Sequence, residues 1–346
     1  MTTNYLLTGS YSSEKERGIK LWKFDGNTGE LTEQMGVEGI ERPSFLAVHP
    51  NGTSFVAVSE VGDGELVSYW IHPIAKKIVE INRQSSNGDH PAHVTIDETG
   101  QWLLCVTYSG ATVNVYPLHA NGAIGDLVAS VKHEGSGPNA DRQDAAHPHS
   151  VIQVPGKNLF LVSDLGADTI STYKLNAETG ALTLRYSIQT EAGAGPRHLS
   201  FHPTKPFVYS VNEINSTLVV YKISQSGELE FFQLFPLIPD SYKGENTSAE
   251  IAVSSDGRFV YASNRGHNSI ASFAVQDNGT LEVIGLTDSG GEGPRHFAII
   301  PGTEWLIVAN ENSHTLTVLN IDHSGAPCTV ENIVQMTAPV CVKVIH

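Results

Sequence analysis

Hydrophobic and polar positions alternate along most of this chain in short runs, and one run recurs many times. Each copy opens on proline or serine, continues as an alternating strand, turns, and enters an apolar strand such as FVYSV or FVYAS. The copies begin at Pro43, Pro91, Pro148, Pro196, Ser248, Pro294 and Pro339. The spacings between these starts are 48, 57, 48, 52, 46 and 45 residues. A period of about 49 residues is typical of β-propeller blades and not of helical solenoids.

Within each copy, a third strand carries a large apolar residue at a fixed place. The residues at this place are Trp22, Tyr69, Tyr116, Tyr173, Tyr221, Phe273 and Leu319. Tight turns often follow, and Asn-Gly at 121–122 and 278–279 is a hairpin signal. No segment shows a sustained period of 3.6 residues, so the pattern gives no indication of long helices. Four short antiparallel strands in each copy predict an all-β protein made of propeller blades.

The two ends of the chain are expected to share one blade. The last copy stops after its first strand, at His346, whereas the N-terminus starts with a second-strand pattern at 5–11 and a third strand at 19–24. Ring closure between the N- and C-terminal strands would leave only short, protected edges. Six internal copies and one shared blade predict a seven-bladed β-propeller that forms a single domain over residues 1–346.

Composition excludes several classes of function. The chain has 21 Lys and Arg against 37 Asp and Glu, a formal charge of −16, which disfavours nucleic acids and anionic membranes as partners. Its three cysteines form no CxxC pair, and the N-terminus lacks the basic and long apolar regions of a signal peptide. No run approaches the 18 apolar residues of a membrane span. We therefore expect a cytoplasmic protein, and the sequence leaves its oligomeric state open.

Aligning the copies separates constant positions from variable ones. Sixteen residues after the start, every residue is small and polar, which indicates a structural cap at a strand end. These residues are Ser59, Thr107, Asp164, Asn212, Asn264 and Asn310. His93, His198 and His296 recur two residues after the start, and we interpret them as scaffold contacts between strands.

Two other columns differ from blade to blade, although a symmetric scaffold does not require such differences. One residue after the start, the copies carry Ser44, Ala92, His149, Arg197, Ala249, Arg295 and Val340. Seventeen residues after the start they carry Glu60, Tyr108, Leu165, Glu213, Arg265 and Glu311, with Tyr11 in the shared blade. One column begins a strand and the other ends its antiparallel neighbour. Both should therefore face one mouth of the central channel.

The charged members of these columns fall in consecutive blades and suggest a binding pocket. Three of the scarce arginines at one mouth of an acidic chain favour an anionic ligand. The alternative is a ring of Arg–Glu pairs that only orders the channel. Two long connections, 133–148 and 236–248, are expected to frame this mouth. For each of them, the alternative is a plain surface insertion.

Metal and serine-nucleophile chemistry have little support in the sequence. His147 and His149 are not accompanied by an HExxH motif or a Cys/His quartet, and the expected pocket already holds three cations. No GxSxG elbow is present. We therefore expect neither a metal nor another cofactor.

Several short motifs resemble the seven-bladed β-propeller lactonase family, which includes bacterial propeller-type 6-phosphogluconolactonases and fungal carboxy-cis,cis-muconate cyclases. The motifs are GSGPN at 135–139, HPHS at 147–150, GPRH at 195–198, NE at 212–213, GENTSAEI at 244–251 and NRGHNSI at 264–270. The resemblance extends over essentially the whole chain. One departure is Asn268, where many members of the family carry Asp.

The resemblance implies a lactone hydrolase, with a 6-phosphogluconolactonase of the pentose phosphate pathway as the favoured activity. Matched motif by motif, the residues with implied catalytic roles are His149, Arg197, Glu213 and Arg265. Either His149 or Glu213 could take the proton from water. The expected binding residues for a small anionic sugar lactone are Arg295, Glu311, Glu60, Tyr108 and Tyr11. The alternatives are a muconate-type cycloisomerase that uses the same pocket and a non-catalytic propeller that binds partner proteins.

Overall fold

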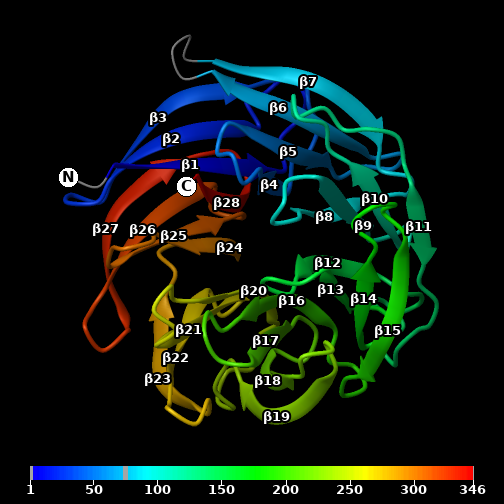
Figure 1. Cartoon of the computed structure of the whole chain (residues 1–346). Helices are drawn as coiled ribbons and strands as arrows, with labels where there is room; N and C mark the ends of the chain where they lie inside the picture. Colours follow the sequence, from blue (N-terminus) through cyan, green and yellow to red (C-terminus); the bar gives the residue numbers. More distant parts are fainter. Residues whose placement is uncertain (1–2, 73–76, 346) are drawn as a thin grey trace.

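Seven four-stranded antiparallel sheets surround a central axis in this protein (Figure 1). The structure is a computed structural model and describes residues 3–72 and 77–345. Its regular elements are all β-strands. Among the described residues there is no helix long and apolar enough to span a membrane. The predicted all-β, seven-bladed propeller is confirmed.

Each blade places its four strands in order from the axis outward. The innermost strands are β4 (Leu46–Val48), β8 (Pro91–Ile96), β12 (Pro148–Gln153), β16 (Pro196–Phe201), β20 (Thr247–Val253), β24 (Pro294–Ile299) and β28 (Pro339–Ile345). The second strands are β5 (Ser54–Ser59), β9 (Trp102–Thr107), β13 (Leu159–Asp164), β17 (Phe207–Asn212), β21 (Phe259–Arg265), β25 (Trp305–Asn310) and β1 (Thr3–Ser10). The third strands are β6 (Glu65–His72), β10 (Thr112–Pro117), β14 (Thr169–Leu175), β18 (Thr217–Ile223), β22 (Ser269–Val275), β26 (Thr315–Ile321) and β2 (Ile19–Asp25). The outer strands are β7 (Lys77–Ser85), β11 (Ala129–Lys132), β15 (Leu182–Gln189), β19 (Leu229–Pro236), β23 (Leu281–Asp288), β27 (Pro327–Gln335) and β3 (Glu30–Val37).

The shared blade closes the ring as the split repeat predicts. Its strand order is β28-β1-β2-β3, so the C-terminal strand lies innermost and the N-terminus supplies the other three. The pairing of β1 with β28 runs from Tyr5 opposite Ile345 to Ser10 opposite Pro339, and Figure 1 shows the two strands side by side. Residues 1 and 2 lie outside the described residues.

The second strands have continuous apolar runs because both of their faces are covered by neighbouring blades. Every residue of β5, β9, β13, β17 and β25 is buried, whereas the outer strand β15 has only half-buried and exposed positions. The fixed large residue of the third strand is also buried, as Trp22, Tyr116 and Phe273 illustrate. The hydroxyl of Tyr116 donates a hydrogen bond to the carbonyl of Ser85 at 2.8 Å, so its polar end is satisfied within the core.

The turn after the second strand repeats one backbone conformation in six of the seven blades. Six non-glycine residues in these turns have φ between 52° and 56°: Asp63, Ala111, Asp168, Ser216, Asn268 and His314. Asn and Asp tolerate this left-handed region and can accept a backbone hydrogen bond there. Asp168 accepts the Gly195 N–H at 2.7 Å, and Asn268 accepts the Gly293 N–H at 2.9 Å. The Asn at 268 therefore preserves the turn that an Asp would make.

The uniform polar column caps the strand ends and also ties down long connections. Asn264 Nδ2 donates to the carbonyl of Leu237, at the start of the second long connection, at 2.9 Å. Asp164 differs from the Asn residues of this column because both of its carboxylate oxygens have a partner on one connection. Its Oδ1 accepts the His147 N–H at 2.8 Å, and its Oδ2 lies 2.7 Å from His133 Nδ1. Asp164 thus holds both ends of the 133–147 connection.

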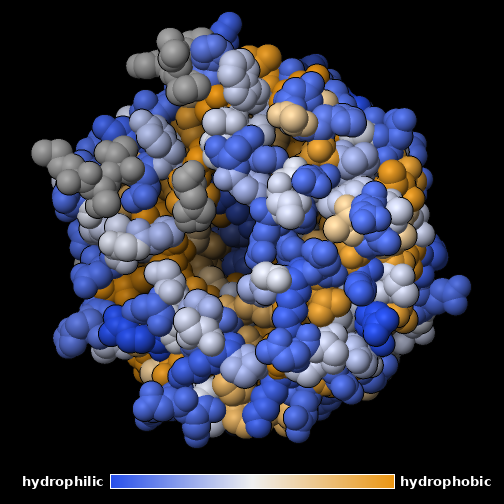
Figure 2. All heavy atoms as spheres, in the orientation of Figure 1, coloured by the Kyte–Doolittle hydropathy of each residue, from blue (hydrophilic) through white to orange (hydrophobic). Residues whose placement is uncertain are grey.

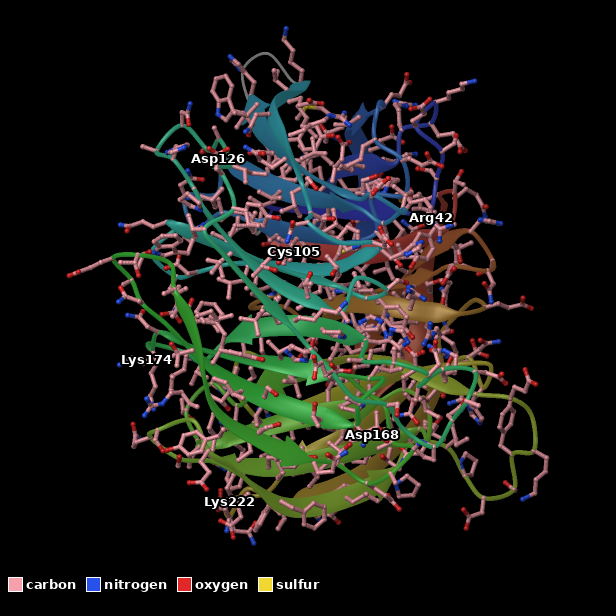
Figure 3. The ribbon with its side chains drawn as sticks, turned by 90° about the vertical axis from the view of Figure 1, so that its right-hand side faces the viewer. Arg42, Cys105, Asp126, Asp168, Lys174 and Lys222 are labelled. Atoms are coloured by element: carbon pink, nitrogen blue, oxygen red, sulfur yellow. The ribbon has the colours of Figure 1, made fainter. Side chains whose placement is uncertain are left out.

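The starts of the innermost strands and the ends of the second strands lie at the same end of the ring, which we call the mouth. Figure 3 labels Arg42 and Asp168 at this end, and Asp126, Lys174 and Lys222 at the opposite end. The 237–246 connection projects at the mouth end in the same view. The ring is hollowed at its axis, as Figure 2 shows. Antiparallel pairing thus brings both variable columns to one face.

Candidate active site

A cavity on the ring axis is lined by six members of the first variable column. They are Ser44, Ala92, His149, Arg197, Arg295 and Val340. Glu60 of the second variable column lines the same cavity. Since each blade repeats the same strand pairing, one sequence position per blade comes to the axis, and the residue types at that position decide the chemistry there. The expectation that these columns face one mouth is confirmed for these residues.

Glu213 is the centre of a buried ion cluster on one side of the mouth. Its Oε2 lies 2.8 Å from Arg197 Nε and 2.8 Å from a terminal nitrogen of Arg265. Its Oε1 accepts a hydrogen bond from Arg142 Nη2 at 2.5 Å. We call Glu213, Arg142, Arg197 and Arg265 the Glu213 cluster. Three guanidiniums and one carboxylate give this cluster a net charge of +2 when all four groups are ionised.

The cluster keeps its carboxylate ionised. Burial alone would raise the pKa of Glu213, but Arg265 and Arg197, followed by His149 and Arg142, hold that pKa well below its usual range. Burial lowers the pKa of Arg197 to about 10, helped by Arg295 and Arg265, and that value is still well above neutral pH. Such a carboxylate is a weak proton acceptor, so its main effect is to hold the guanidiniums in place.

Arg142 is a site residue that neither variable column contains. It lies on the 133–147 connection, which the sequence analysis marked as a loop at the mouth without assigning a role to any of its side chains. No other blade has a connection of this length, so an alignment of copies gives Arg142 no column. The sequence feature that could have identified Arg142 is its place in the long connection that lengthens the spacing between two copies to 57 residues.

His149 lies beside the Glu213 cluster and is neutral near physiological pH. It is buried, and its ring packs edge-on against Tyr108 and His198, with centroid distances of 5.7 and 5.3 Å. Burial, followed by the charge of Arg197, lowers the pKa of His149 well below its usual value. Since both oxygens of Glu213 face guanidiniums, the geometry does not support a Glu213 carboxylate that orients the His149 ring.

Three buried nitrogens of this site have no hydrogen-bond partner within the described part of the chain. They are His149 Nδ1, Arg197 Nε and Arg265 Nε. Arg197 Nε is close to Glu213 Oε2 but is not aligned for a hydrogen bond. Buried polar groups are normally hydrogen-bonded. One imidazole nitrogen and two guanidinium nitrogens are therefore left without a hydrogen-bond partner on one side of the mouth.

The opposite side of the mouth holds a different cluster. Tyr11 donates a hydrogen bond to Glu60 at 2.9 Å and accepts one from Arg295 Nη2 at 2.6 Å. Arg295 also lies 3.7 Å from Glu311, and the guanidinium of Arg42 stacks 4.4 Å above the Tyr11 ring. We call these five residues the Tyr11 cluster. Two arginines face two carboxylates, so this cluster is neutral when all four groups are ionised.

Tyr108 connects His149 to the loop that carries Arg142. Its ring stacks on His147 with a centroid distance of 4.3 Å, and burial raises its pKa although Arg142 acts in the opposite direction. His147 Nδ1 lies 3.0 Å from the Tyr108 carbonyl and Nε2 lies 3.1 Å from Asp144. His147 thus packs the end of the loop. In residues 3–72 and 77–345, no group of three or more His, Cys, Asp or Glu side chains is arranged to hold a metal ion.

Two of the recurrent histidines, His198 and His296, line the cavity together with Phe45. Phe45 contacts the rings of His93, His198 and His296 at centroid distances of 4.0, 5.8 and 5.7 Å. These histidines belong to non-adjacent blades and meet across the axis, so they make the contacts between strands that we interpret from the sequence. Glu250 Oε2 lies 2.9 Å from His198 Nδ1 and 3.0 Å from His296 Nε2.

The chain is similar to known proteins along nearly its whole length. Residues 5–344 match the family model described as "Lactonase, 7-bladed beta-propeller". The chain belongs to this lactonase family. It is 31% identical to the 6-phosphogluconolactonase of Bacillus subtilis (strain 168) over 99% of each chain. It is 32% identical to a 6-phosphogluconolactonase of Formosa agariphila over 92% of each chain.

A solved structure is similar along the whole length of this lactonase-family chain. The periplasmic gluconolactonase PpgL of Pseudomonas aeruginosa superimposes with a TM-score of 0.94 and 28% sequence identity, covering 100% of this chain and 99% of that one. Within this family framework, the structure brings His149, Arg197, Glu213 and Arg265 to one side of the mouth, with Tyr108 beside them. It brings Tyr11, Glu60, Arg295 and Glu311 to the other side.

Proposed function

We propose that this protein hydrolyses 6-phospho-D-glucono-1,5-lactone to 6-phosphogluconate in the cytoplasm, as a step of the pentose phosphate pathway. Membership of the lactonase family supports lactone hydrolysis, and two relatives are named 6-phosphogluconolactonase. The observation that carries the proposal is the juxtaposition of a neutral, buried His149 with a cluster of net charge +2. That combination suits water attack on an anionic ester.

In the proposed reaction, water attacks the lactone carbonyl while His149 takes a proton from it through the unpartnered Nδ1. The carbonyl oxygen gains negative charge, and the free N–H groups of Arg197 and Arg265 donate to it. One preorganised donor of this kind typically contributes about 3–4 kcal/mol to transition-state stabilisation. The bond between the carbonyl carbon and the ring oxygen then breaks, and the imidazolium returns its proton to that oxygen. The products are the carboxylic acid and the free hydroxyl group.

Glu213 supports this chemistry indirectly in the proposal. Both oxygens of Glu213 face guanidiniums, whereas Nδ1 of His149 has no hydrogen-bond partner in the described chain, which leaves His149 as the base. The charge of Glu213 offsets the repulsion between Arg197 and Arg265, so both can remain buried on one side of the substrate. Of the two base candidates that the sequence left open, the geometry favours His149.

The experiment compares the phosphorylated and unphosphorylated glucono-lactones, because PpgL is described as a periplasmic gluconolactonase. Acid release from each lactone is followed near pH 7 and corrected for spontaneous hydrolysis. We expect faster turnover and a lower KM with the phosphorylated lactone. His149→Gln should lower kcat by about 10²- to 10⁴-fold. The exposed His323 gives a matched control, since His323→Gln should retain the wild-type rate.

Three results would contradict the proposal. A wild-type protein that hydrolyses neither lactone above the spontaneous rate is not this enzyme. A wild-type protein that prefers the unphosphorylated lactone is a lactonase with a different substrate. If His149→Gln keeps full activity, the hydrolytic site lies elsewhere in the molecule.

A further inference from the structure

The 133–147 connection is held by buried hydrogen bonds at both ends and in its middle. Asp164 binds the His147 N–H and the His133 ring, and His133 Nε2 in turn lies 2.8 Å from the Tyr173 hydroxyl. Gln143 is fully buried and donates to the Leu165 carbonyl at 2.9 Å. These contacts fix the loop against the second strand of its own blade, so its conformation is built into the blade.

This loop carries Arg142 over the mouth. Arg142 immediately precedes the buried Gln143, and its side chain is 39% exposed, against 3% for Arg197 and 15% for Arg265. It binds Glu213 Oε1, whereas the other two guanidiniums face Oε2. Arg142 is therefore the member of the Glu213 cluster that a molecule entering from solvent meets first.

Of the three arginines in the Glu213 cluster, Arg142 can exchange Glu213 for a ligand at the lowest cost in free energy. If its guanidinium turns to a ligand, Glu213 keeps two cationic neighbours and no buried carboxylate is left unpaired. Moving Arg197 would instead break a hydrogen bond to the Ala249 carbonyl at 2.7 Å in a fully buried position. A planar guanidinium matches the oxygens of a phosphate or carboxylate, and the excess charge of +2 suits a phosphate monoester dianion.

From this arrangement we infer that Arg142 is the residue that recognises the anionic group remote from the lactone carbonyl, and that Asp164 is the positioning residue that fixes the loop for it. The inference rests on the proposed function and adds a specificity determinant to it. Arg197 and Arg265 then serve the reacting carbonyl, and Arg142 serves the phosphate.

The first test measures KM and kcat of Arg142→Gln and Arg142→Lys with both lactones. Loss of one charge-assisted contact predicts an increase in KM of about ten- to hundredfold for the phosphorylated lactone. For the unphosphorylated lactone, KM should change by less than about twofold. Lysine keeps the positive charge but lacks the two parallel N–H donors of a guanidinium. The KM of Arg142→Lys for the phosphorylated lactone should therefore lie between the values of the wild type and of Arg142→Gln. The control is Arg258→Gln, an exposed arginine paired with Asp256 in the turn between β20 and β21.

The second test separates positioning by Asp164 from a general loss of stability. Asp164→Ala frees both ends of the loop, whereas Asp164→Asn resembles Asn212 and Asn264 at the same place in their blades. We expect Asp164→Ala to raise KM selectively for the phosphorylated lactone. The KM of Asp164→Asn for this lactone should remain close to the wild-type value. The double variant Arg142→Gln/Asp164→Ala should be no worse than Arg142→Gln alone. Additive losses, or equal losses with both lactones, would show that Asp164 acts on the fold alone.

A binding measurement distinguishes failure of the inference from failure of the proposed function. Calorimetry with 6-phosphogluconate, and with gluconate as the unphosphorylated control, requires no turnover. An inactive wild type whose affinity for 6-phosphogluconate depends on Arg142 would contradict the function and keep the recognition site. An active wild type whose preference for the phosphorylated lactone survives in Arg142→Gln would contradict the inference and keep the function. A protein that neither turns over nor binds overturns both.

Discussion

The two sides of the mouth are built from the same residue types but differ in net charge. The Glu213 cluster sets three arginines around one carboxylate, and the Tyr11 cluster sets two arginines against Glu60 and Glu311. The first side carries excess positive charge, and the second is self-neutralised. An anion is therefore attracted to one side, while the other offers carboxylate and phenol oxygens that suit the hydroxyl groups of a sugar.

The pKa values of Arg197 and Arg295 differ in the same sense, whereas the pKa of Arg142 in the Glu213 cluster is raised because Glu213 and Tyr108 outweigh its burial. The pKa of Arg197 falls because burial and the neighbouring Arg295 and Arg265 oppose its charge. Burial also acts against Arg295, but Tyr11, Glu60 and Glu311 outweigh it and raise its pKa. A cation whose charge is under-compensated gains more from a bound anion than one that is already paired. The Glu213 side thus has the charge that the proposed anionic substrate requires.

The largest predicted effect follows from removing the centre of the charged side. Glu213→Gln leaves buried guanidiniums facing one another without a counter-charge, and breaking a buried ion network costs about 3–5 kcal/mol of folding free energy. Glu60→Gln on the neutral side should cost about 1 kcal/mol, because Tyr11 can still donate to the amide oxygen. Urea unfolding of both variants checks the difference. Equal losses would show that the two clusters are energetically alike.

The next effect concerns catalysis on the charged side. Arg197→Gln should lower kcat/KM for the phosphorylated lactone by about 10²-fold, because it removes a buried donor from the reacting carbonyl. Arg295→Gln should have a smaller effect on kcat, since Arg295 is engaged by Tyr11 and Glu311. Steady-state kinetics with both lactones test this contrast. Wild-type efficiency in Arg197→Gln would show that the charged side is not the reacting side.

A smaller, distributed effect is predicted for acid stability. Burial lowers the pKa of four histidines at the axis, His93, His149, His198 and His296. Below about pH 6.5 the unfolded chain binds protons that the folded chain does not, so each histidine removes up to about 1.4 kcal/mol of stability per pH unit. The lowered pKa of Glu213 adds to the loss below about pH 4.5.

Thermal unfolding between pH 7.5 and 5 measures this effect. The Tm should be level above pH 7 and should fall as the pH drops below about 6.5. His93 is a useful variant because burial is the first cause of its shift and its Nδ1 has no hydrogen-bond partner within the described chain. His93→Gln should reduce the slope below pH 6.5. An unchanged slope in this variant would show that His93 does not contribute to the acid effect.

The sequence was sufficient for the ring and for most members of the two clusters. Every blade repeats one burial pattern, so period and alternation determine the strands, and differences such as Arg197 against Ala92 at one repeated position mark the candidate site residues. The pairing within the clusters could not be predicted in this way. Glu213 faces three guanidiniums and not the His149 ring. This pairing depends on side-chain geometry, which the aligned sequence positions do not specify.

Features that only one blade possesses were also beyond the sequence. Arg142 depends on a loop conformation that no other copy repeats. In the sequence, Asp164 is one of a column of small polar residues that cap strand ends. Nothing in that column predicts that its second carboxylate oxygen binds His133. The meeting of His93 with His198 across the axis likewise depends on how closely the innermost strands approach, which periodicity does not specify.

The smallest predicted effect tests whether the Tyr11 side is truly self-neutralised. Arg295 and Glu311 are 3.7 Å apart and partly exposed, so Glu311→Gln should cost less than about 1 kcal/mol of stability. The same change leaves the Tyr11 cluster with an excess positive charge, which should lower KM for the phosphorylated lactone by up to about twofold at low salt. The gain should fade above about 0.3 M salt, because exposed charges are then screened. A rise in KM for both lactones would instead mean that Glu311 contacts the sugar directly, and that the neutral side binds substrate through its charges as well as its hydrogen bonds.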